Sequence, residues 1–353
     1  MAILVCLVLK SPIDKSGYLY PDLKPRHDFT SNSSGSSPWL SDTVKVIRLD
    51  KTAFTHADVL KATGNFANDR IIGRGGFGTV YRGLLPDGRD VAIKKKLREG
   101  IEGEREFRAE MEVLTRNGLG WPHPNLVTLY GWCLYGSEKL LVYEYMDGGN
   151  LEDILVDKSG FKWKRRIHVA IDVAHALVFL HHECYPSIVH RDVKASNVHV
   201  STMVAGTIGY VAPEYGQTWQ ATTKGDVYSF GVLVMELATG RRAVDGGDEC
   251  LVEWAKRVMG DGRSGFNHKV IPAELLASGL ADGAMEMYEL LRVGIRCTAE
   301  APQLRPNMKE VTIHRHEMDV ENLKHSRQIL INGRVDQNPS HTRPIAIVDR
   351  QCL

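Results

Sequence analysis

The chain has 353 residues, of which 43% are hydrophobic and 25% charged, and its formal net charge at pH 7 is +1. These values are typical of a globular protein, and the near-zero net charge provides no basic field for nucleic acid. The six cysteines form no C-x-x-C pair, which argues against a disulfide framework and a zinc site and favours a reducing compartment. They are Cys6, Cys133, Cys184, Cys250, Cys297 and Cys352.

The chain opens with an apolar segment, residues 2–9, followed by Lys10. A membrane-spanning helix needs about 20 apolar residues, so this segment cannot span a membrane alone. It lacks the positive start and the small-residue cleavage site of a signal peptide. Two interpretations remain: an apolar N-terminus that packs against the protein, and, for residues 1–10, the remnant of a transmembrane helix. The second is favoured by the positive residues that follow, Lys10, Lys15, Lys24 and Arg26.

Residues 11–66 are predicted to form a juxtamembrane linker that ends in a short helix. The composition of residues 11–50, with Pro12, Pro21, Pro25 and the serine-rich run 31–38, cannot bury enough apolar surface to order itself. The sequence Thr55-His56-Ala57-Asp58 then predicts a capping box. It opens a helix with Val59, Leu60 and Ala62 on one side.

Residues 71–81 read I-I-G-R-G-G-F-G-T-V-Y. The glycines let the backbone turn tightly and approach phosphate oxygens without a clash from a Cβ atom. The glycine-rich turn of a dinucleotide-binding fold has a similar sequence, but in that fold a helix follows the turn. Here residues 80–83 continue as a strand and residues 85–88, L-P-D-G, predict a hairpin turn. The order of glycine-rich segment, hairpin turn and strand therefore argues against a dinucleotide-binding fold.

The next predicted strand, residues 91–94, ends at Lys94. Alternation along a strand places Lys94 on the same face as Ala92, toward a nucleotide. Lys95 and Lys96 are interpreted as a solvated basic patch. In the predicted helix 104–114 the residues at helical spacing, Phe107 included, form a buried stripe, and Glu110 flanks it.

Two further strands are predicted at residues 126–133 and 140–146. The second leads into Asp147-Gly148-Gly149-Asn150, a flexible hinge before a helix. A plain core strand followed by a turn would have the same residues, so both interpretations stay open here. An apolar helix from Trp163 to His182 then leads to a polar loop.

That loop, residues 190–197, reads H-R-D-V-K-A-S-N, and residues 206–214 read G-T-I-G-Y-V-A-P-E. Asp226 begins a strongly apolar helix, where a carboxylate is commonly a cap. Arg305-Pro306 supplies a late arginine and a proline suited to a first helical turn.

Together these motifs resemble the cytoplasmic kinase of plant leucine-rich-repeat receptor-like kinases, from about Phe54 to Val311. Lys194, two residues after Asp192, resembles the serine/threonine class. The resemblance implies an α+β, two-lobed protein-kinase-like fold with ATP between the lobes. A small β-rich N-lobe would span residues 67–146 and a larger α-helical C-lobe residues 147–313. Residues 314–353 would form a partly disordered tail.

The resemblance also implies a site. Asp192 would orient the attacking hydroxyl and accept its proton, Lys194 would steady the γ-phosphate, and Asn197 would hold Mg²⁺. Lys94, paired with Glu110, would hold the α- and β-phosphates. The remaining ATP-binding positions would be Gly73, Gly75, Gly76, Phe77, Gly78, Val80, Ala92, Glu144 and Met146. Structural roles would fall to Asp226 and to Arg305, which would pair with Glu214 in the C-lobe, and autophosphorylation to Ser201, Thr202 and Thr207.

One part of the family pattern is missing. A family member has two short strands and then Asp-Phe-Gly roughly a dozen residues beyond the catalytic Asn. Here His199 to Ala205 lead straight to Gly206, and no Asp-Phe-Gly occurs in the chain. The sequence is interpreted as cut between Val198 and His199, by an omitted exon or a faulty gene model. Mg²⁺ would lose its main carboxylate, and with it most of the charge stabilisation of phosphoryl transfer.

We therefore expect a serine/threonine protein kinase by family, acting in receptor signalling with ATP and Mg²⁺ and impaired in catalysis. Its partners would be protein substrates or co-receptor kinases, without nucleic acid. By family it would act at the cytosolic face of the plasma membrane, attached through a helix that is truncated here, whereas this chain alone would be cytosolic. The alternatives are a kinase-shaped binding module without turnover and a non-functional product that does not fold stably.

Overall fold

The computed structural model describes residues 9–10, 45–46, 54–75, 78–96, 123–135, 138–148, 150–156, 161–185, 187–199, 209–214, 221–244, 249–260 and 281–312. The chain divides into two compact units, Met1–Val311 and Thr312–Leu353. Only the first is treated below, since the second lies outside the described residues apart from Thr312.

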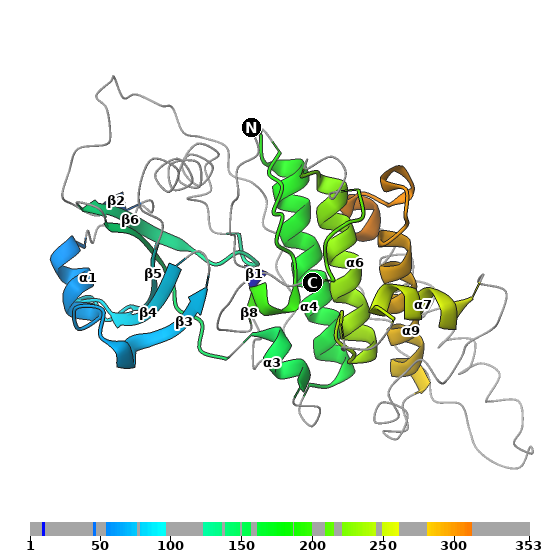
Figure 1. Cartoon of the computed structure of the whole chain (residues 1–353), viewed down its shortest axis with the longest axis horizontal. Coiled ribbons are helices and arrows are strands. Elements are labelled where there is room, and N and C mark those ends of the chain that lie inside the picture. The colour runs from blue at the N-terminus through cyan, green and yellow to red at the C-terminus, as the bar shows by residue number, and fades with distance from the viewer. Residues whose placement is uncertain are drawn as a thin grey trace, which may run out of the picture. The chain divides into compact units, whose positions relative to one another are not determined.

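The first part of this unit is an antiparallel sheet with the strand order β2-β6-β7-β5-β4-β3 (Figure 1). Along β5 the buried residues Val91 and Ile93 alternate with less buried ones, whereas β7 carries the continuous buried run 139–143. The strands are β2 (Lys45–Val46), β3 (Ile71–Gly75), β4 (Gly78–Leu84), β5 (Asp90–Lys95), β6 (Leu129–Tyr135) and β7 (Glu138–Glu144).

A short helix, α1 (His56–Ala62), lies between β2 and β3 in the chain and contacts β4 (Figure 1). It begins with the predicted capping box: Thr55 Oγ1 accepts from the Asp58 amide and the Asp58 carboxylate accepts from the Thr55 amide. Phe54 and Val59 are buried in a separate apolar cluster on the sheet, which otherwise consists of Leu85, Val91, Ile93, Cys133, Leu140 and Val142. The segment that contains α1 is thus part of a core.

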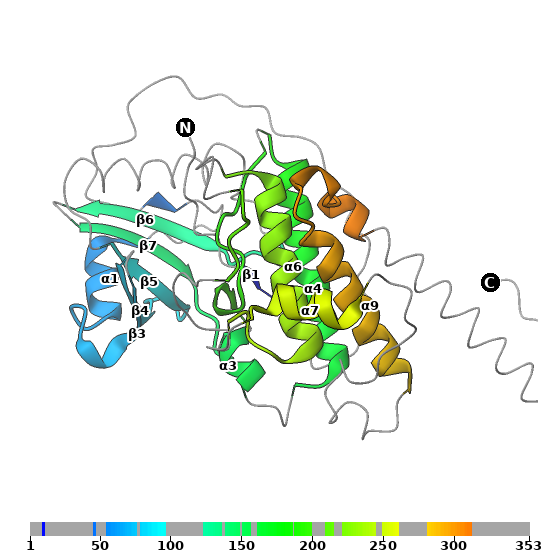
Figure 2. The ribbon, with the colours of Figure 1, turned by 45° about the vertical axis from the view of Figure 1, so that its right-hand side comes forward.

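The second part of the unit is helical. Its elements are α3 (Leu151–Val156), α4 (Trp163–Val178), η2 (Phe179–Glu183), η3 (Ala195–Asn197), α6 (Thr223–Thr239), α7 (Leu251–Met259), α9 (Ala281–Cys297) and η5 (Pro302–Leu304). α6 packs against α4, α7 and α9 (Figure 2). A Cβ on Gly231 would lie 2.7 Å from the Cβ of Cys297, so α6 and α9 approach as closely as a glycine allows.

The apolar N-terminal segment ends in a strand. β1 (Leu9–Lys10) pairs in parallel with β8 (Val198–His199), the strand that follows Asn197. Within the residues that the structure describes, no helix has the length and apolar character that crossing a membrane requires.

Candidate active site

The loop before β8 brings three of the predicted site residues together. Lys194 Nζ lies 2.9 Å from Oδ1 and 3.0 Å from Oδ2 of Asp192. Asn197 Nδ2 donates to the Asp192 carbonyl at 2.8 Å and to its Oδ2 at 2.7 Å. The Lys194 side chain is buried, whereas the Asp192 side chain is 24% exposed. The lysine and the amide therefore hold the carboxylate in one orientation while leaving it open to a substrate.

Asp226, at the start of α6, fixes the backbone of this loop. Its carboxylate accepts from the amides of His190 and Arg191, both at 2.7 Å, and lies 2.8 Å from His181 Nε2. Arg191 has a φ of +72°, which is uncommon for a residue other than glycine. Two consecutive amides that donate to one buried carboxylate offset this strain. The Asp192 amide in turn donates to His190 Nδ1 at 3.2 Å.

Tyr210 connects the loop 190–197 to α6. Its hydroxyl accepts from the Ala195 amide at 3.3 Å and donates to the Glu236 carboxylate. Glu236 also accepts from the Ala243 amide at 2.7 Å. Burial raises the pKa of Glu236 to about 7, and burial beside this carboxylate raises the pKa of Tyr210 far above its usual range. The predicted motif contains Tyr210, but its spacing gave no sign of the contact with Glu236.

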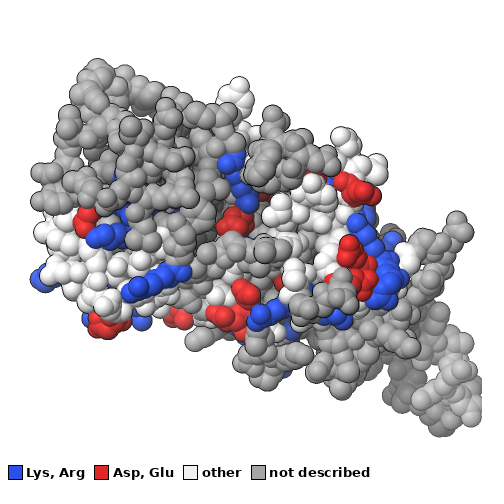
Figure 3. Space-filling model, in the orientation of Figure 1, with Lys and Arg blue, Asp and Glu red and all other residues white. Residues whose placement is uncertain are grey.

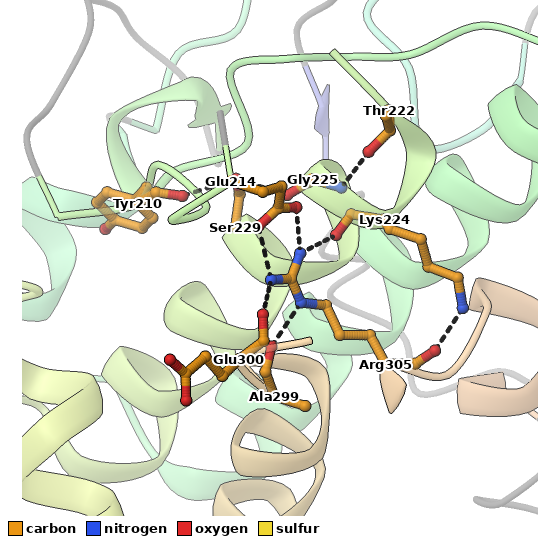
Figure 4. Close-up of polar contacts among 9 residues, drawn as sticks. All are labelled: Tyr210, Glu214, Thr222, Lys224, Gly225, Ser229, Ala299, Glu300 and Arg305. Atoms are coloured by element: carbon orange, nitrogen blue, oxygen red, sulfur yellow. Dashed lines mark hydrogen bonds and ion pairs between the residues drawn. The ribbon is translucent and has the colours of Figure 1, made fainter. Parts of the chain in front are cut away.

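Arg305 joins the predicted A-P-E segment to the helical part (Figure 4). Nη1 and Nη2 donate to the two carboxylate oxygens of Glu214 at 2.6 and 2.8 Å. The guanidinium also donates to the carbonyls of Ala299, Lys224 and Glu300. The hydrogen bond from Arg305 holds the pKa of the Glu214 carboxyl below its usual value, so the pair is ionised at neutral pH.

The sheet carries the predicted nucleotide-binding residues. Lys94 lies opposite Val80 of β4 and Leu141 of β7, and Ala92 lies two residues before it on β5. Gly78, which begins β4, has a φ of +142°, and a Cβ there would lie 2.3 Å from the Lys95 carbonyl oxygen. Only glycine fits this position.

The other predicted nucleotide positions flank these. Gly73 and Gly75 belong to β3, Glu144 ends β7, and Met146 follows it. The Glu144 amide donates to the Thr128 carbonyl at 2.9 Å. Six predicted site residues lie outside the described part of the chain: Gly76, Phe77, Glu110, Ser201, Thr202 and Thr207.

The donor set does not make a magnesium site within the described residues. No three His, Cys, Asp or Glu side chains there are grouped as metal ligands. The Asp192 carboxylate is engaged by Lys194 and Asn197, which leaves the Asn197 amide oxygen as a neutral ligand. Mg²⁺ is bound through carboxylates and phosphates in such sites.

Lys95 is a correction to the sequence analysis, which interpreted it as part of a solvated patch. Its ammonium binds the Glu138 carboxylate and lies 4.1 Å from the centroid of the Phe66 ring. The sequence missed this because Glu138 lies 43 residues away along the chain. Elsewhere on the described part of the face in Figure 3, basic and acidic side chains are interspersed.

Two protein families match this chain. The protein kinase domain family matches residues 66–203, and the protein tyrosine and serine/threonine kinase family matches residues 202–314.

Curated relatives are similar over most of the chain. A probable LRR receptor-like serine/threonine-protein kinase of Arabidopsis thaliana is 61% identical over 333 residues, which cover 87% of this chain and 30% of that protein. The leucine-rich repeat receptor protein kinase EMS1 of the same plant is 40% identical over 318 residues, which cover 80% of this chain and 26% of that protein. The chain thus spans less than a third of the length of these relatives.

A solved structure is also similar. The pseudokinase domain of BIR2, described as an immune regulator of the RLK/Pelle family, superimposes with a TM-score of 0.61 at 32% identity. The match covers 76% of this chain and 86% of that domain.

Proposed function

This chain belongs to the protein kinase family, among the leucine-rich-repeat receptor-like serine/threonine kinases, and we propose that it is the kinase region of such a receptor with disabled phosphoryl transfer. The predicted family, the two-lobed fold and the serine/threonine kinase class are confirmed. The loss of phosphoryl transfer goes beyond these confirmed predictions and is the content of the proposal.

The arrangement of Asp192, Lys194 and Asn197 carries the assignment of the site. The Asp192 carboxylate is ordered by both neighbours and is partly exposed, so it can accept a hydrogen bond from a substrate hydroxyl and then its proton. Lys194 lies where it can neutralise phosphate charge once Asp192 has bound the hydroxyl. Lys94 on β5 would hold the α- and β-phosphates of ATP.

The loss of activity is inferred from the missing metal ligand. Mg²⁺, held by a carboxylate together with Asn197, would neutralise the charge that develops on the transferred phosphate. The chain has no Asp-Phe-Gly after Asn197, and a single neutral amide oxygen is a poor substitute for a carboxylate. The two family matches also meet at residues 202–203, next to the position where the sequence is interpreted as cut. Positioning groups are thus present while charge stabilisation is lost.

A kinase-shaped binding module without turnover is the second candidate, and the similarity to the BIR2 pseudokinase domain favours it. In either case we propose that the chain acts at the cytosolic face of the plasma membrane, with other receptor kinases or their protein substrates as partners; the similarity to receptor-like kinases supports this. The two candidates differ in whether the chain binds ATP, because the disabled kinase keeps a nucleotide site and the binding module needs none.

Thermal unfolding with ATP, in Mg²⁺ or in EDTA, tests the proposal. ATP at 100 times its Kd stabilises a protein by about 2.7 kcal/mol. We expect equal stabilisation in both buffers, lost in Lys94→Met and kept in Lys256→Met, which removes the same charge from the exposed face of α7. Stabilisation by ATP that needs Mg²⁺ would show that a metal site remains. A parent chain that ATP does not stabilise at all would exclude nucleotide binding.

A further inference from the structure

A cluster of charged and aromatic side chains connects residues 54–66, which lie between β2 and β3, to the strand that carries Lys94. We propose that residues 54–66 position the nucleotide site by holding Lys95, and through it strand β5, with Glu138 as the connecting residue. The proposal rests on the function proposed above, because that function gives Lys94 its role. It adds a set of positioning residues outside the catalytic loop.

Glu138 is the centre of the cluster. One of its carboxylate oxygens binds Lys95 Nζ, and the other lies 2.9 Å from Nε2 of His56, the first residue of α1. The side chains of His56, Glu138 and Lys95 are 10%, 27% and 29% exposed, so water screens this chain of contacts only in part. Burial alone would raise the pKa of Glu138, but the hydrogen bonds from Lys95 and His56 outweigh it and lower the pKa.

Phe66 approaches Lys95 from the other end of the segment. The Lys95 ammonium lies 4.1 Å from the centroid of its ring, within the range of a cation–π contact. The same ring meets Tyr81 of β4 edge-on, at 5.1 Å between centroids. Lys95 is thus held by an anion and by an aromatic face, both of which belong to or contact residues 54–66.

The turn that presents Phe66 is strained. Gly64, Asn65 and Phe66 have φ values of +59°, +57° and +59°, and the left-handed region is unfavourable for the two that are not glycine. The Thr63 hydroxyl accepts from the Phe66 amide at 3.2 Å and donates to the Val59 carbonyl at 2.8 Å, which connects the turn to α1. Such strain persists only where the surroundings enforce it, and it concentrates at functional positions.

α1 is also fixed against the sheet. A Cβ on Gly83 of β4 would lie 3.1 Å from the Ala62 Cβ and 3.0 Å from Ile93 Cδ1, so helix and strand are in close contact there. Val59 is fully buried in the apolar cluster that also contains Ile93. The helix therefore offers a rigid support from which His56 and the turn act on Lys95.

Lys95 lies at the point where such support matters for the nucleotide. It is the residue after Lys94, and alternation turns the two side chains to opposite faces of β5. Its carbonyl oxygen borders Gly78, where a Cβ would lie at 2.3 Å, so its backbone also supports the end of the glycine-rich loop. Holding the Lys95 side chain on one face of β5 therefore fixes the two groups that would bind phosphate, which are Lys94 and the end of the glycine-rich loop.

Backbone hydrogen exchange and ATP affinity in Glu138→Gln test this proposal. Asp90→Asn is the matched control, because Asp90 forms an ion pair with Arg82 at the opposite end of β5. In Glu138→Gln we expect amides 92–96 to exchange about fivefold faster and ATP to bind about fivefold more weakly, as loss of a partly buried ion pair implies. Lys95→Arg, which can keep both contacts, should retain parent values, and Phe66→Leu should resemble Glu138→Gln.

Three results would overturn the proposal. The first is unchanged amide exchange of β5 in Glu138→Gln, and the second is an effect of Asp90→Asn as large as that of Glu138→Gln. The third is faster exchange in Glu138→Gln that extends equally to the amides of α6, which would indicate general destabilisation. The exchange measurement needs no nucleotide. A parent chain that binds no ATP, but in which Glu138→Gln frees only β5, would refute nucleotide binding and support the positioning of the strand.

Discussion

Glu236 makes the stability of the helical part depend on pH in a direction that is unusual for a carboxylate. It is buried on α6 and its pKa is raised from 4.5 to about 7 by burial and by the nearby charge of Glu152, against hydrogen bonds from Tyr210 and Ala243 and the charge of Arg242. The folded chain therefore keeps a proton between pH 4.5 and 7 that the unfolded chain has already lost.

The sign and size follow from this difference. Stability falls with rising pH wherever the folded state binds more protons, so this contribution is fully present below pH 4.5 and is gone above pH 7. One pKa unit corresponds to about 1.4 kcal/mol. Moving the pKa from 4.5 to about 7 then predicts a loss of about 2–3 kcal/mol between pH 5 and pH 8.

Urea denaturation of the parent and of Glu236→Gln at several pH values between 5 and 8 measures this contribution. Glutamine does not titrate, so the difference between the two proteins isolates Glu236 from every other titrating group. We expect the glutamine variant to gain about 2–3 kcal/mol relative to the parent as the pH rises. Glu249→Gln, at an exposed ion pair with Arg257, should run parallel to the parent. Parallel curves for Glu236→Gln as well would refute the reasoning.

Two further substitutions test the packing. Arg305→Lys keeps the charge but loses the two-oxygen contact with Glu214 and leaves buried carbonyls without donors. Urea denaturation should therefore show that the free energy of unfolding falls by about 3 kcal/mol, and a fall below about 1 kcal/mol would contradict this. Gly231→Ala forces a Cβ to within 2.7 Å of Cys297 and should lower the unfolding free energy by about 1–3 kcal/mol, while Gly225→Ala on the same helix, whose Cβ meets its nearest atom at 3.7 Å, should not.

The sequence contained enough to predict that Asp192, Lys194 and Asn197 belong to one site, and the structure brings these three residues into contact. The residue types and spacing at Asp192, Lys194 and Asn197 suffice because all three lie within six positions, where the local backbone decides their geometry. The partnership of Glu214 with Arg305 was also predicted, although 91 residues separate them. It came from the resemblance, since nothing in the local sequence of either residue indicates the other.

Contacts between distant segments without a motif could not be predicted. Lys95 looked like a solvated cation because its partner, Glu138, lies in another hairpin. Glu236 sits among apolar residues of α6, where its pattern gives no hint of the Tyr210 hydroxyl. The pairing of β1 with β8 is of the same kind, because two-residue strands carry no periodicity.

The central claim is that the positioning groups of a protein kinase are present while phosphoryl transfer is lost. Intact-mass analysis after incubation with Mg·ATP tests it most directly, with Asp192→Asn as the control. We predict no added phosphate on either chain, and addition of phosphate once a family-like Asp-Phe-Gly segment is inserted after Val198. Phosphate on the parent chain, absent from Asp192→Asn, would contradict the account and require another carboxylate to hold the metal.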